Sequence, residues 1–199
     1  MAQIHVEKNV GGIQGLCLIS PTVHEDARGY SMEAFNAREM REAGLDIAFV
    51  QDNQSLSRKG VLRGMHFQKE HPQCKLVRVL CGEVFDAVVD VRQGSETFGK
   101  WYGVILSAEN KKQLLIPEGF AHGFLVLSEE AEFFYKLNDF WHPNDEGGVA
   151  WNDAQIGINW PGVHRENDRY VMMDGTPLVM SEKDKRWGSL LETFPKCKD

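Results

Sequence analysis

The sequence predicts an all-β protein, a sandwich or barrel of short strands with a few short helices. Three observations favour this class: apolar runs of strand length, alternation of apolar and polar residues within them, and 19 glycines spread between them. Residues 84–91 show the alternation best, because every second residue from Phe85 to Val91 is apolar and these side chains share one face. This pattern alone does not separate a jelly roll from other sandwiches.

A second strand is predicted at residues 76–80, where an apolar run ends at Cys81 and Gly82. With residues 84–91 it suggests a hairpin that turns near Gly82. Further strands are predicted, in chain order, at residues 103–106, 113–116, 120–127 and 132–137.

Helix signals are few. Asn36 fits the N-cap of a short helix with Glu39 at its third position, and Gly44 is a plausible stop. Residues 181–184 could open a short helix near the C-terminus. Two short helices among several strands leave the all-β class unchanged.

The 199 residues fit one domain over residues 1–199. No apolar run approaches the ~20 residues that span a bilayer, and the N-terminus lacks the layout of a secretion signal, so we expect a cytoplasmic protein without membrane contact. The net charge of −7 disfavours binding to nucleic acid. The cysteines form no Cys-x-x-Cys pair, so reduced thiols are expected at Cys17, Cys74, Cys81 and Cys197.

Residues 60–68 carry the first candidate for chemistry. In a regular strand Arg63 and His66 face opposite ways, but a bulge at Gly64 would let both reach one cavity. Histidine is the side chain best suited to take a proton near neutral pH. The alternative is a core histidine that is hydrogen-bonded to a backbone carbonyl, and spacing alone favours that alternative.

Three further candidates have equally ordinary alternatives. His122 shares an apolar strand face with phenylalanines and Tyr135 shares one with Phe133, so both fit core packing as well as a site. Lys75 and Arg28 fit solvated charge, but such cations also hold a phosphate or a developing oxyanion.

The residues around His66 do not predict a metal. No histidine lies two residues away, and its neighbours Met65, Phe67 and Gln68 are poor ligands, so we expect no metal in this protein. The chain also lacks a Gly-rich phosphate loop and a G-x-S-x-G motif, which leaves those enzyme classes without support.

Read together, the motifs resemble the dTDP-4-dehydrorhamnose 3,5-epimerase family. The resemblance runs in order from about residue 10 to residue 185, which leaves a short C-terminal tail, and rests on residues 26–30, 49–53, 61–68, 75–78, 82–86, 97–101, 106–111, 116–124, 135–136, 151–153 and 181–184. It implies a cupin-type jelly-roll β-sandwich that forms a homodimer and needs no cofactor or metal. The implied substrate is a dTDP-4-keto-6-deoxy sugar, inverted at C3 and C5 on the path to L-rhamnose.

The resemblance also implies catalytic roles. His66 would remove the acidic hydrogen next to the C4 ketone, and Asp184 would hydrogen-bond His66 and stabilise the imidazolium. Asp184 also fits a helix-capping role. Lys75 would neutralise the enolate oxygen, and Tyr135 would return a proton from the opposite face.

The implied binding residues fall in two groups. Arg63 and His122 would line the sugar and diphosphate region. The nucleotide would be held partly by a neighbouring subunit's strand that carries the early Arg and Glu, and the set comprises Arg28, Glu33, Gln51, Asp52, Asn53, Glu146 and Lys183.

The sequence departs from the family pattern in two places. Phe140 and Trp141 stand where the family commonly has two tyrosines, so a C3-only epimerase, or one for a related nucleotide sugar, is an alternative. Residues 162–180 form a longer segment than the pattern has, and its charged residues indicate a surface loop. A ketoisomerase of the same fold and a non-catalytic sugar-nucleotide binding module are the other classes, and the joint presence of His66 and Tyr135 disfavours both.

Overall fold

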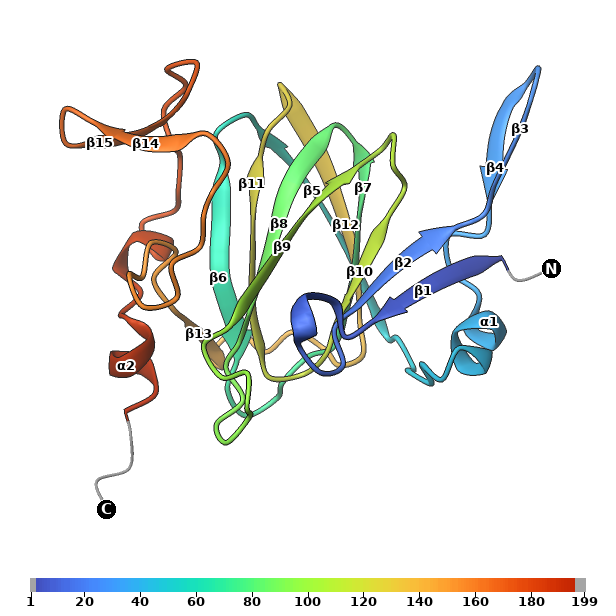
Figure 1. Cartoon of the computed structure of the whole chain (residues 1–199), viewed down its shortest axis with the longest axis horizontal. Coiled ribbons are helices and arrows are strands. Elements are labelled where there is room, and N and C mark those ends of the chain that lie inside the picture. The colour runs from blue at the N-terminus through green and yellow to red at the C-terminus, as the bar shows by residue number, and fades with distance from the viewer. Residues whose placement is uncertain (1–2, 196–199) are drawn as a thin grey trace.

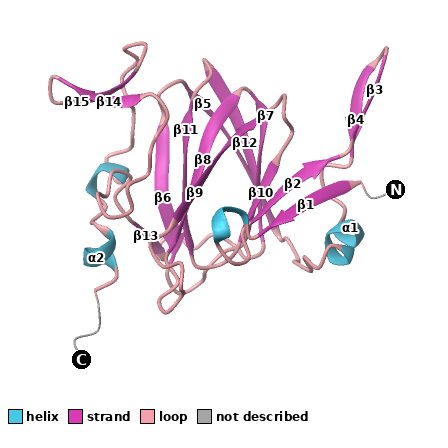
Figure 2. Ribbon diagram, in the orientation of Figure 1, coloured by secondary structure: helices cyan, strands magenta, loops and turns pink. Residues whose placement is uncertain are grey.

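Two facing antiparallel sheets form the body of the protein in the computed structural model, which describes residues 3–195 (Figures 1 and 2). In spatial order the larger sheet consists of β1 (Ile4–Lys8), β2 (Cys17–Pro21), β10 (Gln113–Ile116), β7 (Lys75–Cys81), β12 (Glu130–Leu137) and β5 (Gln51–Arg58). The smaller one consists of β13 (Glu146–Gly148), β6 (Leu62–Gln68), β11 (Phe120–Val126), β8 (Glu83–Asp90) and β9 (Trp101–Ser107).

This architecture is a cupin-type jelly-roll sandwich with short helices, and it confirms the predicted fold class. The predicted strands are all present, with ends that differ from the expected ones by two residues at most, and residues 113–116 coincide with β10. The last residues of the expected C-terminal tail, with Cys197, lie outside the described residues. The other three cysteines, Cys17, Cys74 and Cys81, are free thiols.

The predicted hairpin at Gly82 is wrong. Strand β7 pairs with β10 and β12 in the larger sheet, whereas β8 pairs with β11 and β9 in the smaller one. Only Gly82 separates the two strands, and a hairpin loop needs at least two residues. Gly82 instead turns the chain from one sheet to the other at φ 75°, where a Cβ atom would lie 2.0 Å from the carbonyl oxygen of Glu130.

The core fills the space between the sheets. Buried side chains from both sheets pack there, among them Val77, Leu114 and Phe133 from the larger sheet and Val88 and Phe124 from the smaller. The Phe124 and Phe133 rings stack with centroids 4.2 Å apart and join the two sheets directly. They also form part of the wall of the cavity described below.

The helices are short, as predicted. The side chain of Asn36 accepts hydrogen bonds from the backbone N–H groups of Arg38 and Glu39 and caps α1 (Ala37–Glu42), which ends before Gly44 at φ 78°. Residues 181–184 do not open an α-helix: the chain makes a single 3₁₀ turn, η2 (Asp184–Arg186). The last helix, α2 (Leu190–Thr193), starts at the Ser189 N-cap, and a further 3₁₀ turn, η1 (Val10–Gly12), precedes β2. No helix in the described part of the chain is long and apolar enough to cross a membrane.

Two hairpins extend from the body (Figure 1). One is formed by β3 (Val23–Asp26) and β4 (Gly29–Met32), the other by β14 (Val163–Glu166) and β15 (Arg169–Met172). The second hairpin corrects one part of the expectation for residues 162–180: the segment contains two paired strands and not a simple loop, and Val171 and Met172 are buried, while its charged stretch at residues 165–169 is exposed as expected. The segment then returns to the body, where Val179 pairs with Val61.

Candidate active site

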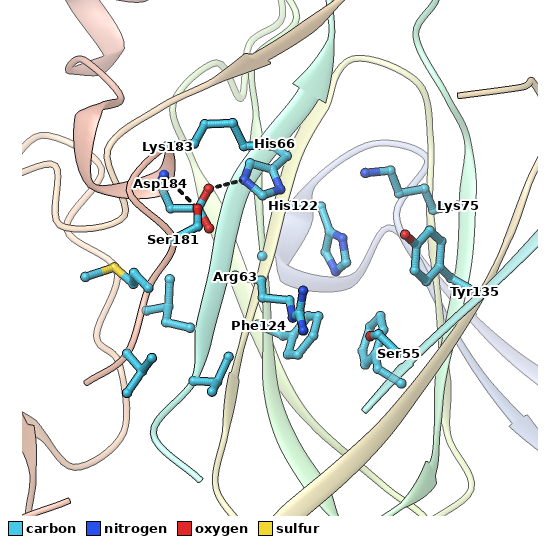
Figure 3. A pocket seen from close by; sticks show the side chains of 16 residues that line it. Ser55, Arg63, His66, Lys75, His122, Phe124, Tyr135, Ser181, Lys183 and Asp184 are labelled. Carbon is cyan, nitrogen blue, oxygen red and sulfur yellow. Dashed lines mark hydrogen bonds and ion pairs between the residues drawn. The ribbon is translucent and has the colours of Figure 1, made fainter. Parts of the chain in front are cut away.

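A cavity of about 690 Å³ opens between the two sheets (Figure 3). Strands of both sheets line it, and the segment that follows the second hairpin closes one side. The predicted site residues that line it are Arg63, His66, Lys75, His122, Tyr135, Lys183 and Asp184. The sequence therefore distributes the candidate residues along the chain, and the jelly roll gathers them.

A bulge in β6 places two of these side chains. His122 on β11 lies opposite His66, and Phe124, two positions further on, lies opposite Arg63, so β6 contains one extra residue between its two partners. The expected bulge at Gly64 is thus confirmed, and both Arg63 and His66 reach the cavity. Gly64 has φ 141°, and a Cβ atom there would lie 2.6 Å from the β11 backbone, so only glycine fits.

His66 is held by a buried carboxylate. Its Nε2 lies 2.7 Å from Asp184 Oδ1. Burial alone would raise the pKa of Asp184, but hydrogen bonds from His66 and Ser181 outweigh it and lower that pKa. The ionised carboxylate is an acceptor only, so Nε2 carries the N–H and Nδ1 is the nitrogen that can take a proton. The Asp184 N–H in turn donates to Ser181 Oγ at 3.1 Å, so the side chain that caps this turn is that of Ser181, whereas the Asp184 carboxylate contacts His66.

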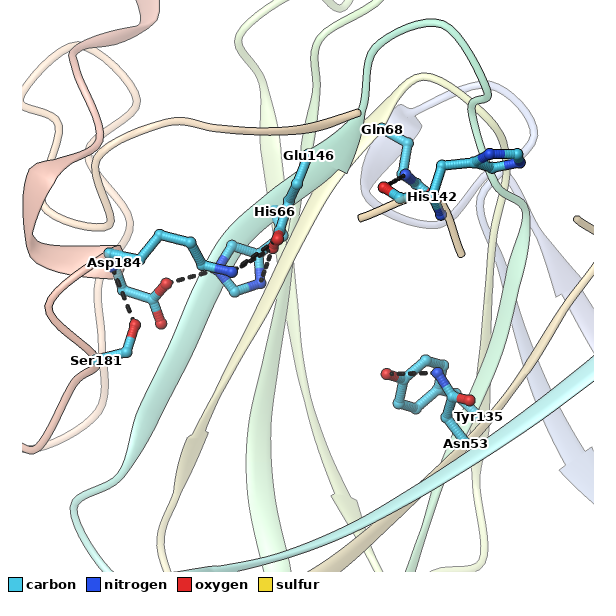
Figure 4. Close-up of polar contacts among 9 residues, drawn as sticks. Asn53, His66, Gln68, Tyr135, His142, Glu146, Ser181 and Asp184 are labelled. Carbon is cyan, nitrogen blue, oxygen red and sulfur yellow. Dashed lines mark hydrogen bonds and ion pairs between the residues drawn. The ribbon is translucent and has the colours of Figure 1, made fainter. Parts of the chain in front are cut away.

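Charged groups surround the other edge of the imidazole. Glu146 Oε1 lies 3.7 Å from His66 Nδ1, beyond hydrogen-bond distance, and Lys183 Nζ bonds both oxygens of Glu146 at 2.7 Å (Figure 4). Lys183 therefore engages the carboxylate that would otherwise compete for the Nδ1 position. The indole of Trp187 packs edge-on against His66 with centroids 6.3 Å apart.

Tyr135 lies on the opposite wall. It projects from β12 of the larger sheet, facing His66 of the smaller sheet across the cavity (Figure 3). Asn53 Nδ2 donates to the Tyr135 hydroxyl at 3.1 Å, so the phenol accepts there and can direct its own hydrogen to a ligand. Asn53 and Glu146 line a smaller adjoining cavity of about 100 Å³ that shares His66 and Tyr135 with the main one.

Lys75 supplies a cation between these walls. Removal from water lowers the pKa of its ammonium to about 8, and the nearby carboxylates of Asp86 and Glu146 only partly oppose this shift. The group is therefore still mostly charged at neutral pH but titrates within reach of it. A cation in such a place stabilises negative charge that develops on a bound molecule.

His122 rests on a buried carboxylate that the sequence analysis did not single out. Its Nε2 lies 2.9 Å from Asp86 Oδ2, and the Asp86 side chain is completely buried on β8. Burial lowers the pKa of His122 and raises that of Asp86. An aspartate in a strand of buried apolar residues needs a partner, and this signal was available in the sequence.

Two other contacts also escaped sequence reasoning. Ser57 Oγ accepts a hydrogen bond from Arg63 Nε at 3.0 Å and fixes the guanidinium at the cavity mouth. Trp187, described above, had no signal, because it lies beyond the last matching motif and reaches His66 only through the fold.

The structure does not bring every candidate to the cavity. Arg28 lies at the tip of the first hairpin and bonds Asp26, and Glu33 follows the same hairpin and accepts from Asn36. Asp52 points to the other face of β5, where it pairs with Lys136. Gln51 does not line either cavity, but it contacts a residue that does, because its Nε2 donates to Asn53 Oδ1 at 2.9 Å.

This arrangement has a definite chemical capacity. A ligand bound between the sheets meets a base-competent imidazole at one face, a phenol at the other, and an ammonium nearby. Such a site can remove a proton from one side of a carbon atom and add a proton to the other side.

Similarity to known proteins agrees with this geometry. Residues 11–192 match the family described as dTDP-4-dehydrorhamnose 3,5-epimerase. A curated protein of that name from Methanothermobacter thermautotrophicus is 50% identical over 180 residues, which cover 90% of this chain and 92% of the relative. The crystal structure of a dTDP-6-deoxy-D-glucose-3,5-epimerase from Legionella pneumophila, in complex with dTDP-4-keto-L-rhamnose, has a TM-score of 0.84 at 45% identity and covers 94% of this chain and 93% of that chain. A 3'-monoepimerase from Streptomyces bikiniensis, in complex with dTDP-quinovose, has a TM-score of 0.79 at 32% identity and covers 90% and 85%.

Proposed function

This chain belongs to the dTDP-4-dehydrorhamnose 3,5-epimerase family, and from that premise we propose that it inverts C3 and C5 of dTDP-4-dehydro-6-deoxy-D-glucose to give dTDP-4-dehydro-L-rhamnose. One observation carries the proposal: His66 and Tyr135 face each other across a single cavity, from opposite sheets. Inversion requires a base on one face of the sugar ring and an acid on the other, because a single base returns the proton to the side from which it came.

The first step removes the hydrogen at C3. The C4 ketone makes this hydrogen acidic, because the electron pair of the broken C–H bond delocalises onto the ketone oxygen as an enolate. His66 takes the proton at Nδ1, and the carboxylate of Asp184 at Nε2 stabilises the imidazolium that forms.

Lys75 stabilises the charge that this step creates. Its ammonium lines the cavity, and in this proposal it faces the C4 oxygen, where negative charge grows as the enolate forms. Preorganised charge of this kind commonly supplies the largest single contribution to catalysis, and the low polarity around a desolvated lysine strengthens it.

Tyr135 completes the inversion. Its hydroxyl hydrogen passes to C3 from the opposite face, the enolate electron pair forms the new C–H bond, and the ketone is restored. Asn53 holds the hydroxyl at 3.1 Å and stabilises the phenolate that remains. Proton exchange with solvent resets His66 and Tyr135, and the same sequence at C5 gives the doubly inverted product.

A homodimer is part of this proposal. The hairpin of β3 and β4 projects from the body (Figure 1) and carries Arg28, with Glu33 just beyond it, and neither side chain reaches the cavity of its own chain. Hairpins exchanged between two copies would bring these residues to the neighbouring nucleotide, where the arginine suits the diphosphate. A cytoplasmic location stays a prediction from the sequence.

Proton NMR of the 4-keto sugar nucleotide in deuterium oxide tests the reaction. We expect deuterium at both C3 and C5, with conversion to the L-configured product. Exchange without any change of configuration would contradict the epimerase, and movement of the carbonyl between C3 and C4 would indicate a ketoisomerase instead. A nucleotide that binds with no exchange at all would indicate a binding module.

A C3-only epimerase is the second candidate, and Trp141 favours it. Trp141 lines the smaller cavity beside Asn53 and Tyr135, at a position where the family pattern commonly has a tyrosine. Without the tyrosine hydroxyl, one polar contact to the sugar is missing during the second inversion. The same NMR experiment decides, because this candidate gives deuterium at C3 and none at C5.

A further inference from the structure

We propose that His71, Asp139 and His142 form a binding site for a divalent transition metal of the zinc type, separate from the catalytic cavity. One ligand atom from each residue lies within 4.8 Å of the other two. His71 comes from the segment between β6 and β7, and the other two come from the segment that follows β12. The fold thus brings together two imidazoles and a carboxylate from distant parts of the chain.

The two imidazoles already face each other. Their rings stack with centroids 4.0 Å apart and planes 15° from parallel, and His71 is exposed to solvent. Two nitrogens bound to one tetrahedral zinc ion lie about 3.4 Å apart, as Zn–N bonds of about 2.0–2.1 Å require. Because the lone pair of an imidazole nitrogen lies in the ring plane, both rings must rotate out of the stack about their side-chain torsions so that the two nitrogens converge on one ion.

Buried side chains hold the backbone of this cluster. Gln68 accepts from the His142 N–H at 3.2 Å and donates to its carbonyl at 2.8 Å, while Gln73 donates to the carbonyl of Asp139 at 3.0 Å. Both glutamines are 8% exposed. On the other side, the Asp145 carboxylate accepts from the His71 N–H at 2.9 Å. The backbone of the segments that carry the three ligands is therefore held in place without an ion, so that only the side chains have to move when a metal binds.

The site is distinct from the catalytic one but connected to it. The His142 ring points away from His66 and Tyr135, with Gln68 on the near side (Figure 4). The same segment carries Trp141. Its backbone N–H donates to Gln51 Oε1 at 3.1 Å, and the residue lines the smaller cavity. A metal ion bound here would clamp the segment that positions Trp141.

The ligand set selects the class of ion. Neutral imidazole suits zinc, cobalt, nickel and copper, whereas calcium and magnesium take sets of oxygen ligands. Two imidazoles and one carboxylate leave a fourth position for water on a tetrahedral ion. This proposal departs from the expectation of no metal, which considered only ligands close to His66 in the sequence.

Calorimetric titration of the full chain with zinc chloride tests the site. We expect one saturable zinc ion per chain. His71→Ala and His142→Ala should each weaken binding by at least the 10–100-fold that loss of a supporting contact to a metal ligand costs, because each removes a ligand itself. The matched control is His164→Ala, which removes a histidine from the second hairpin and should bind zinc like the unaltered chain.

Cobalt provides a second readout that does not depend on calorimetry. We expect bound cobalt to show visible absorption with the intensity of a tetrahedral site and no thiolate charge-transfer band. This visible absorption should be lost in His142→Ala and in Asp139→Asn. Circular dichroism of each variant confirms that it folds. Absence of saturable zinc binding, equal affinity in the unaltered chain and both histidine variants, or a thiolate band that moves the site to Cys81 would each overturn the proposal.

Discussion

The imidazole of His66 and the carboxylate of Asp184 are 2.7 Å apart although 118 positions separate them in the chain. The 3₁₀ turn η2 presents Asp184 to β6 at the one edge of the imidazole that faces away from the cavity centre (Figure 3). The contact therefore fixes the tautomer of His66 and leaves Nδ1 for the substrate.

Asp184→Asn tests this relationship. The amide can donate to Nε2, which favours the wrong tautomer and no longer stabilises the imidazolium. We expect kcat to fall roughly 10²–10⁴-fold with little change in KM. Glu182→Gln is the control, because Glu182 lies two residues before Asp184, is exposed and forms an ion pair with Lys185. Equal rates in the two variants would contradict the assigned role.

Tyr135→Phe separates proton removal from inversion. His66 can still remove the hydrogen at C3, so we expect NMR in deuterium oxide to show exchange at C3 with retained configuration. Formation of the inverted product should fall roughly 10²–10⁴-fold, because the acid on the opposite face is missing. Tyr170→Phe is the control, since Tyr170 lies on the second hairpin, where it packs against Trp151 and does not line the catalytic cavity. Normal inversion in Tyr135→Phe would show that another group is the acid.

The titration of Lys75 should determine how kcat/KM depends on pH above neutrality. The pKa of its ammonium is about 8, lowered by burial, so the stabilising charge is present below that pH and lost above it. We expect kcat/KM to fall as the pH rises through about 8, since this parameter reports groups of the free enzyme. In Lys75→Arg the guanidinium stays charged, so the fall should move to higher pH. Lys59→Arg, outside the cavity, should keep the original profile, and an unchanged profile in Lys75→Arg would exclude Lys75 as its source.

Apolar runs and alternation in the sequence predicted β7 to β12, but they predicted neither strands such as β2 and β5 nor how the strands pair. Residues 113–116 alternate little, yet their apolar run is bounded well enough that β10 was predicted to the residue. The segments on either side of Gly82 read equally well as strands, but which sheet each one joins depends on long-range pairing. A local pattern contains no information about such partners.

The candidate site shows the same division. The glycine between Arg63 and His66 predicted the bulge, because the conformational demand is local. Asp184 as the partner of His66 came only from family resemblance, and the cluster of His71 with His142 came only from the fold. Contacts across such distances in the chain follow from topology, and spacing along the chain does not reveal them.

A buried aspartate, Asp90, stabilises the body of the protein. Asp90 is fully buried and accepts hydrogen bonds from Arg92, Ser95 and Thr97. Burial alone would raise its pKa, but these donors outweigh it and lower the pKa to about 2. We expect Asp90→Asn to reduce the free energy of unfolding at pH 7 by about 2–4 kcal/mol, because Arg92 loses its charged partner and one acceptor oxygen replaces the two that now serve Arg92, Ser95 and Thr97.

The chain offers a matched control for this variant. Asp26 and Arg28 repeat the local geometry of Asp90 and Arg92, with the same spacing and the same paired hydrogen bonds, but on the exposed hairpin. Asp26→Asn should leave the free energy of unfolding unchanged, since an exposed ion pair contributes little.

Urea denaturation at several pH values tests how the contribution of Asp90 depends on pH. Because the folded pKa of Asp90 is depressed, its stabilisation is complete above the ordinary value of 3.8 and is lost as the pH falls through about 2, so the difference between Asp90→Asn and the unaltered chain should shrink over that interval. A difference that stays constant down to that pH would show that shape, and not the carboxylate charge, accounts for the effect.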